Sequence, residues 1–182
     1  MRDVFELGLP SGISQSSYVR SYSAILSHFT SIQKFQENDY VCCAHMVYGW
    51  MPTILEIYLD ESFISIGEAA ELLQKAKNNE CLSFQEVESL AKITNNSLVG
   101  SSKILHFTNP EMYPIWDSRI YCFVFEENPY SYRVVKVEKY FQYIERLKEL
   151  VNDSRFPDFY RKIVDRIGYR VTKFRALELG KL

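Results

Sequence analysis

The hydrophobic residues of this chain recur mainly at intervals of three and four positions, the spacing that places side chains on one face of an α-helix. From Lys136 to Val151 the apolar side chains trace one stripe, and the stretch from Phe156 to Ile167 repeats the pattern. Weaker stretches of the same periodicity predict further helices at 18–29, 39–48, 65–73, 83–93, 101–107, 117–124 and 171–179. The first seventeen residues, which include four serines, are expected to form an irregular lead-in.

Local signals mark where several of these helices begin. Ser65 is followed by Glu68, and Ser83 by Glu86, in the spacing of a capping box, which satisfies backbone amides at a helix start. Asp39 is expected to cap the second helix through its carboxylate. These signals place three helix starts independently of the hydrophobic pattern.

The run from Tyr48 to Pro52 interrupts the second helix with a glycine and a proline. Two outcomes are open. The helix ends there, or it bends and resumes with Ile54 and Leu55.

Strand-like alternation is rare in the sequence, and residues 131–137 are the best candidate for one short β segment. Many helices with short connections predict an all-α fold, an orthogonal helical bundle. Residues 1–182 are expected to form a single helical domain, or else two helical subdomains.

The composition indicates a folded, reduced protein without a metal site. Apolar residues make up 47% of the 182 residues, enough for a sizeable core. The four cysteines include no C-x-x-C pair, and His28 and His45 share no ligand spacing with a cysteine or acid cluster. We find neither the basic flank and apolar run of a signal peptide nor an apolar run long enough to span a membrane. We therefore expect a cytoplasmic protein with no cofactor, no metal and no membrane partner.

Charge is distributed unevenly along the chain. Residues 132–182 carry a net charge of +6, and residues 1–131 carry −8. A basic C-terminal third could face a phosphate backbone, or helical surfaces could simply vary in charge.

The segment 83–119 holds the most informative pattern. A capped helix is followed by the turn Ser97-Leu98-Val99-Gly100 and by a second helix that starts at Ser101-Ser102. Leu98 and Val99 would anchor this hairpin, and Gly100 would allow its tight backbone geometry. Free amides at the start of the second helix could bind a DNA phosphate without reading sequence.

A proline-containing loop then leads to Asp117 at the start of another helix. This order resembles the helix-hairpin-helix/Gly-Pro-Asp superfamily of DNA glycosylases, especially its 8-oxoguanine glycosylase-like branch. The resemblance implies a protein that binds duplex DNA and cleaves the N-glycosidic bond of a damaged base. Bifunctional members place a catalytic lysine two residues after the hairpin glycine. Here that position is Ser102 and Lys103 follows it, while Leu98 replaces the first hairpin glycine.

Within that resemblance, Asp117 and Lys103 are the candidate catalytic residues. A carboxylate beneath the sugar would stabilise the positive charge that develops as the bond breaks. An amine with a lowered pKa could attack the sugar and form a Schiff base. An extruded base would need a pocket with aromatic walls, for which the candidates are Tyr48, Trp50, Phe107 and Trp116.

The candidate DNA-binding residues lie in the hairpin and on basic positions elsewhere. They are Leu98, Val99, Gly100, Ser101, Ser102, Arg119, Arg170, Lys173 and Arg175.

Each of these residues also has a purely structural interpretation. Asp117 could only cap its helix, Lys103 could be solvated, and Trp116 could belong to the core. His106 is better explained as a buried, hydrogen-bonded histidine than as a base. Two other function classes remain open: a non-catalytic nucleic-acid-binding helical module, and a helical protein-interaction protein of a mobile element.

Overall fold

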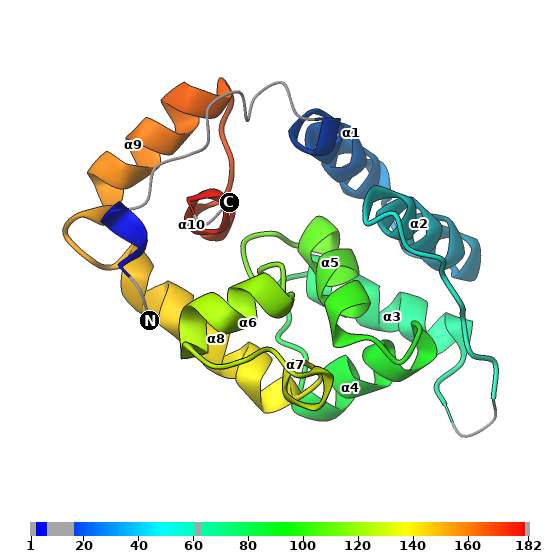
Figure 1. Cartoon of the computed structure of the whole chain (residues 1–182). Helices are drawn as coiled ribbons and strands as arrows, with labels where there is room; N and C mark the ends of the chain where they lie inside the picture. Colours follow the sequence, from blue (N-terminus) through cyan, green and yellow to red (C-terminus); the bar gives the residue numbers. More distant parts are fainter. Residues whose placement is uncertain (1–2, 7–16, 61–62, 181–182) are drawn as a thin grey trace.

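Ten α-helices with short connections make up the fold of residues 3–6, 17–60 and 63–180, the part of the chain that the computed structural model describes (Figure 1). A short 3-10 turn, η1 (Val4–Glu6), precedes them. The helices are α1 (Ser17–Ser31), α2 (Glu37–Trp50), α3 (Ile66–Lys77), α4 (Phe84–Ile93), α5 (Leu98–Thr108), α6 (Ser118–Phe125), α7 (Ser131–Val134), α8 (Val137–Val151), α9 (Phe156–Ile167) and α10 (Lys173–Leu179). The predicted all-α bundle is confirmed.

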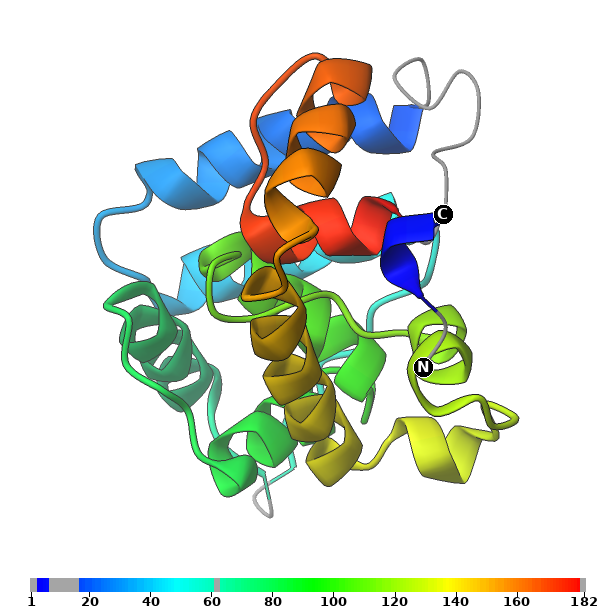
Figure 2. The ribbon, with the colours of Figure 1, turned by 90° about the vertical axis from the view of Figure 1, so that its left-hand side faces the viewer.

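Helix α5 lies at the centre of the fold, where it packs against α1, α2, α3 and α4 (Figure 1). Helix α4 also packs on α8, and α10 packs on α8 and α9. Figure 2 shows α10 running across the line of α8 and α9. This crossing brings α10 next to the loop that precedes α6, because Glu178 of α10 accepts a hydrogen bond from the backbone N–H of Ile115.

Both predicted capping boxes are present. The Ser65 hydroxyl accepts a hydrogen bond from the backbone N–H of Glu68, at 3.1 Å, and the Ser83 hydroxyl accepts one from Glu86, at 3.3 Å. At the other end of a helix, Gly168 ends α9 in the left-handed conformation, with φ of 83°. The local sequence therefore places these boundaries correctly, because each depends on contacts within one helical turn.

Helix α2 begins earlier than predicted and does not resume after its interruption. Asp39 lies inside the first turn, and its carboxylate accepts a hydrogen bond from the backbone N–H of Gln36 at 2.8 Å. After Trp50 the chain leaves the helical conformation, and Ile57 forms an isolated antiparallel bridge with Thr94. Of the two outcomes left open by the sequence, the helix ends.

The predicted β segment at 131–137 is wrong. Ser131 to Val134 form α7, and α8 begins at Val137. The buried valines of this stretch, Val134 and Val137, lie three positions apart, while Val135 is 52% exposed. Burial therefore follows the helical spacing, which a short run of β-branched residues hides.

The predicted irregular lead-in lies largely outside the described residues, since positions 7–16 are not among them. Val4 in η1 is buried, and α1 already begins at Ser17. Among the described helices, none combines the length and hydrophobicity needed to cross a membrane.

Candidate functional site

The hairpin between α4 and α5 differs in register from the sequence prediction. Thr94 ends α4, and Asn95 and Asn96 turn the chain with φ of 55° and 47°. Ser97 caps α5, its hydroxyl accepting from the Gly100 N–H at 3.1 Å. Residues 98–100 therefore form the first turn of a helix and not the hairpin itself. Asparagine tolerates the left-handed region, so the turn does not need a glycine.

Gly100 is needed for close packing instead. A Cβ atom at this position would lie 2.0 Å from the hydroxyl oxygen of Tyr48 and 2.6 Å from its Cζ. The Tyr48 hydroxyl in turn donates a hydrogen bond to the Thr94 carbonyl, at 3.3 Å. Tyr48, expected as a wall of a base pocket, is buried between α2 and the start of α5.

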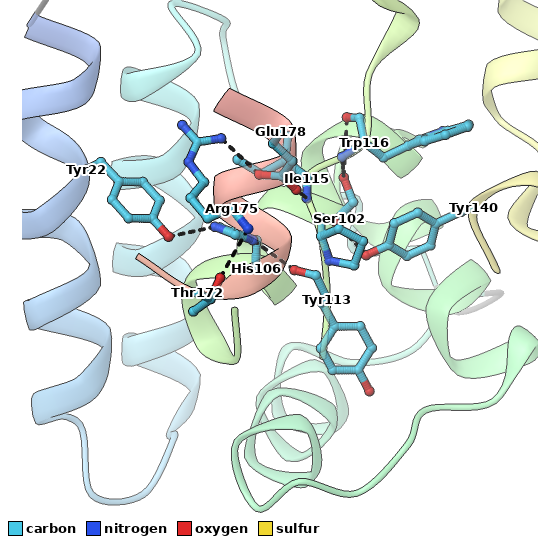
Figure 3. Close-up of polar contacts among 11 residues, drawn as sticks. Tyr22, Ser102, His106, Tyr113, Ile115, Trp116, Tyr140, Thr172, Arg175 and Glu178 are labelled. Atoms are coloured by element: carbon cyan, nitrogen blue, oxygen red, sulfur yellow. Dashed lines mark hydrogen bonds and ion pairs between the residues drawn. The ribbon is translucent and has the colours of Figure 1, made fainter. Parts of the chain in front are cut away.

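The two serines expected to contact DNA are buried on α5. The Ser101 hydroxyl donates to the Ser97 carbonyl at 3.1 Å. The Ser102 hydroxyl accepts from the backbone N–H of Trp116 at 3.2 Å (Figure 3). Both serines are at most 1% exposed. The Ser101 hydroxyl therefore bonds only within the start of α5, and Ser102 attaches the loop before α6 to the central helix.

That loop, which runs from Asn109 to Trp116, is fixed along its length. The Asn109 side chain donates to the Ala76 carbonyl at 2.9 Å. The Tyr140 hydroxyl donates to the Pro114 carbonyl at 2.9 Å, and the Trp116 indole N–H donates to Val134 at 2.8 Å. The loop therefore delivers the next residue, an aspartate, to a defined position.

Asp117 caps α6, as predicted, with Oδ1 accepting from the backbone N–H of Ile120 at 2.8 Å. It is half-buried, and it also lines a pocket of ≈ 470 Å³. The capping interaction and the pocket involve the same carboxylate. The pocket is lined by Tyr18, Ile115, Asp117, Ser118, Arg119, Ile120, Cys122, Phe123, Pro129, Arg175 and Glu178.

A buried ion pair forms part of the pocket wall. Arg175 Nη1 donates to Glu178 Oε2 at 2.9 Å, and Glu178 Oε1 accepts from the Ile115 N–H (Figure 3). The Arg175 guanidinium lies over the rings of Tyr22 and Tyr18, 4.8 Å and 5.7 Å from their centroids. The prediction that Arg175 contacts DNA is not supported, because the structure places this residue inside the protein, 3% exposed. Burial opposes the charged form of Arg175, but Glu178 raises its pKa.

Lys103 lies half-buried on α5, one position beyond the inward-facing Ser102. Burial lowers the pKa of its amine; Arg175 lowers it further, while Asp117 and Glu178 oppose the shift. All three of these charged residues line the pocket, although Lys103 itself does not. The structure thus brings Lys103 and Asp117 into one electrostatic environment, and one residue of helix rotation, about 100°, separates this position from that of Ser102.

His106 is buried and hydrogen-bonded, which is the structural interpretation favoured from the sequence. Its Nδ1–H donates to the Tyr113 carbonyl at 2.8 Å, so Nε2 accepts from the Tyr22 hydroxyl at 2.8 Å (Figure 3). Burial and the charge of Arg175 lower its pKa to about 3, against the opposing effect of the Tyr113 bond. A neutral imidazole therefore joins α1, α5 and the loop.

The four aromatic residues proposed as pocket walls do not line this pocket. Phe107 and Trp116 are at most 1% exposed and belong to the core. Trp50 stacks on Tyr18, with centroids 3.9 Å apart and planes at 18°, and its indole N–H donates to the Tyr18 carbonyl at 3.2 Å. The aromatic lining comes instead from Tyr18 and Phe123. Sequence periodicity assigned both to helix faces, and nothing local showed that these faces meet at Asp117.

The remaining basic candidates stay at the surface. Arg119 is exposed and lines the pocket, two residues after Asp117. Arg170 and Lys173 are exposed on either side of the start of α10. These three residues are sterically available to a phosphate backbone, unlike Arg175.

Within the described part of the chain, no group of three or more histidine, cysteine, aspartate or glutamate side chains could hold a metal ion. No protein-family model matches the chain, and no curated protein or solved structure is significantly similar to it.

Proposed function

We propose that the protein binds duplex DNA and cleaves the N-glycosidic bond of a damaged base, with Asp117 as the catalytic carboxylate. One observation carries the proposal. A fixed loop holds Asp117 at a pocket lined by Tyr18 and Phe123, and Asp117 contributes to the electrostatics of the Lys103 amine, whose pKa is lowered by burial. A volume of ≈ 470 Å³ falls in the range of small-molecule sites, and aromatic walls suit a stacked base.

In the proposed reaction the bond between C1′ of the sugar and the base nitrogen breaks, and its electron pair leaves with the base. The Asp117 carboxylate stabilises the positive charge that develops on the sugar. Water then adds to C1′, and the proton it loses balances the charge of the departing base. Asp117 suits this role because its capping bond fixes the carboxylate before substrate arrives.

Lys103 provides a second route. A lowered pKa increases the fraction of neutral amine, the form that can attack C1′ and release the base, giving a covalent intermediate. Lys103 then carries the sugar as an iminium ion, which borohydride reduces to a stable adduct. Lys103 does not line the pocket, so this role requires its side chain to turn toward bound DNA.

DNA would lie across the exposed cations near the pocket. Arg119, Arg170 and Lys173 are exposed. The first turn of α5 contributes less to this surface than the sequence predicts, because Leu98 and Gly100 are buried. Contacts of this kind bind phosphates and fix the position of the duplex without reading its sequence.

Excision from synthetic duplexes tests the proposal. Duplexes carrying 8-oxoguanine, uracil, hypoxanthine or an alkylated base are incubated with the protein, and abasic strands are counted after alkaline cleavage. We expect excision from at least one duplex, lost in Asp117→Asn and retained in Glu111→Gln. Asparagine preserves helix capping, and Glu111 is an exposed carboxylate of the same loop. Folded protein that excises none of these bases would refute the enzymatic function.

Borohydride trapping tests Lys103 separately. A covalent adduct lost in Lys103→Ala, but kept in Lys92→Ala on the exposed face of α4, would assign the nucleophile. An adduct that survives Lys103→Ala would exclude this residue from the covalent route. Excision without an adduct would indicate that the bond is hydrolysed by water with the help of Asp117 alone.

A non-catalytic DNA-binding module is the second candidate function. The observation that favours it is the burial of Ser102, at the position where bifunctional glycosylases carry lysine. It predicts binding that weakens steeply with salt and does not distinguish lesions. Affinity that is unchanged after neutralising Arg119, Arg170 and Lys173 would argue against it.

A further inference from the structure

The buried ion pair in the pocket wall has no part in the chemistry proposed for Asp117. Arg175 and Glu178 are 3% and 2% exposed in their side chains, and both line the pocket. Burying two charges is costly unless their donors and acceptors are well satisfied. The donors and acceptors of this pair that are not used within the protein therefore determine which polar groups of a bound molecule the pocket can hydrogen-bond.

The pair has more donors than acceptors to offer. Glu178 accepts from Arg175 through one carboxylate oxygen and from the Ile115 N–H through the other. The Arg175 guanidinium has five N–H donors and no acceptor. One of them goes to Glu178 Oε2, and the Tyr18 hydroxyl forms a further side-chain hydrogen bond with Arg175. The Arg175 Cζ atom lies over the rings of Tyr22 and Tyr18, and the N–H groups that neither Glu178 nor Tyr18 uses remain for further hydrogen bonds.

We propose that Arg175, held by Glu178, makes the pocket selective for uncharged bases that carry a carbonyl oxygen, and against bases with a fixed positive charge. The first class includes the products of deamination and oxidation, and the second includes bases methylated on a ring nitrogen. A carbonyl accepts a hydrogen bond from the guanidinium edge, whereas a cation meets a like charge in a poorly solvated site. The inference rests on the proposed function, which identifies the pocket as a base pocket.

The acidic residues of the pocket make the opposite prediction. Asp117 and Glu178 line the same pocket, and their negative charge would favour a positively charged occupant. We assign Asp117 to the sugar because its position is fixed by the capping bond to Ile120, and both oxygens of Glu178 already accept hydrogen bonds, from Arg175 and from Ile115. Comparing a neutral with a cationic occupant therefore shows whether the arginine or the carboxylates select the base.

Binding of nucleosides to the whole protein tests this directly. The key pair is 3-methyl-2′-deoxyuridine and 3-methyl-2′-deoxycytidine, which carry the same methyl group at the same ring nitrogen. At neutral pH the first is uncharged with two carbonyls, and the second is a cation. By isothermal titration calorimetry we expect the uridine to bind about tenfold more tightly, the size of one charge-assisted hydrogen bond. Equal affinities, tighter binding of the cation, or no binding of either would overturn the inference.

Variants then assign the preference to the ion pair. Arg175→Met combined with Glu178→Gln removes both charges at similar volume, and it should abolish the difference between the nucleosides. Arg161→Met, at an exposed arginine of α9 that does not line the pocket, is the control and should keep it. Arg175→Lys retains the charge with fewer donors and should keep a smaller preference. A preference unchanged in the double variant would refute the role of Arg175. If a variant fails to fold, the comparison of the two nucleosides on the unmodified protein still tests the inference.

Excision assays on the same preparations separate this inference from the proposed function. A nucleoside preference with no excision from any duplex would remove the enzymatic function and leave the selectivity of the pocket. Excision without a preference for the neutral nucleoside would support the enzymatic function and refute the selectivity of the pocket.

Discussion

Substituting Gly100 by alanine gives the sharpest test of the packing around α5. On helix propensity alone the change should stabilise the protein, because alanine is favoured over glycine inside a helix by about 1 kcal/mol. The structure predicts the opposite sign. The new Cβ would lie 2.0 Å from the Tyr48 hydroxyl oxygen, far inside van der Waals contact.

The size of the effect follows from how little Tyr48 can move. Its side chain is 2% exposed, and its hydroxyl is bonded to the Thr94 carbonyl. Overpacking a buried site costs about 1–3 kcal/mol, which outweighs the gain in propensity. Displacing Tyr48 would also break its bond to Thr94, worth about 1 kcal/mol. We therefore expect Gly100→Ala to lower the free energy of unfolding by about 2 kcal/mol.

Urea unfolding followed by circular dichroism measures this, in a double-mutant cycle with Tyr48. Tyr48→Leu removes the ring and is destabilising alone, but Gly100→Ala should cost little or even stabilise in that background. Tyr48→Phe should rescue only in part, because Cζ would still lie 2.6 Å from the Cβ. A stabilised Gly100→Ala single variant, or a cost unchanged by Tyr48→Leu, would show that this contact does not determine the glycine.

Three further predictions concern the site. Asp117→Ala should lower the free energy of unfolding by about 1 kcal/mol, and Asp117→Asn by only a few tenths, because asparagine also caps; equal losses in urea unfolding would contradict the cap. Arg175→Met should cost about 3–5 kcal/mol by leaving Glu178 buried and unpaired, and adding Glu178→Gln should recover most of it; a double variant no more stable than the single one would count against the pair. The pKa of His106 falls from 6.5 to about 3 on folding, so between these values the unfolded chain binds one more proton. The free energy of unfolding should decrease as pH falls through this window, by about 1.4 kcal/mol per pH unit from this group alone. His106→Gln should remove that part of the slope in pH-dependent unfolding, and an identical slope in the variant would refute the assignment.

The features that the sequence predicts well are those determined within one or two helical turns. The capping boxes at Ser65 and Ser83 and the aspartate cap at Asp117 depend on side chains and amides three residues apart. Their local geometry is almost independent of what the helix packs against. The all-α class follows from many such segments in series.

The errors have a common physical origin in contacts between distant segments. The sequence predicts Arg175 as a DNA-binding residue, and arginine is rarely buried, but Glu178 and two tyrosine rings enclose it. Gly100 was assigned to a turn, but its reason lies in Tyr48 on another helix. The sequence shows the residue type in each case and not the distant partner. That partner is Tyr48 for Gly100, more than fifty positions away, and the rings of Tyr18 and Tyr22 on α1 for Arg175.

Counting residues from Gly100 places the catalytic lysine of bifunctional glycosylases at Ser102, but the packing of α5 makes that count a poor guide. The Ser102 side chain is turned toward the Trp116 backbone, which it holds at 3.2 Å. A lysine at this position would have to displace the loop that carries Asp117. Lys103, about 100° further around the helix, is the position whose amine interacts electrostatically with Asp117, Arg175 and Glu178. The single-residue offset therefore does not by itself argue against a role for the lysine in the proposed reaction, because the electrostatic contribution of Asp117 falls on Lys103.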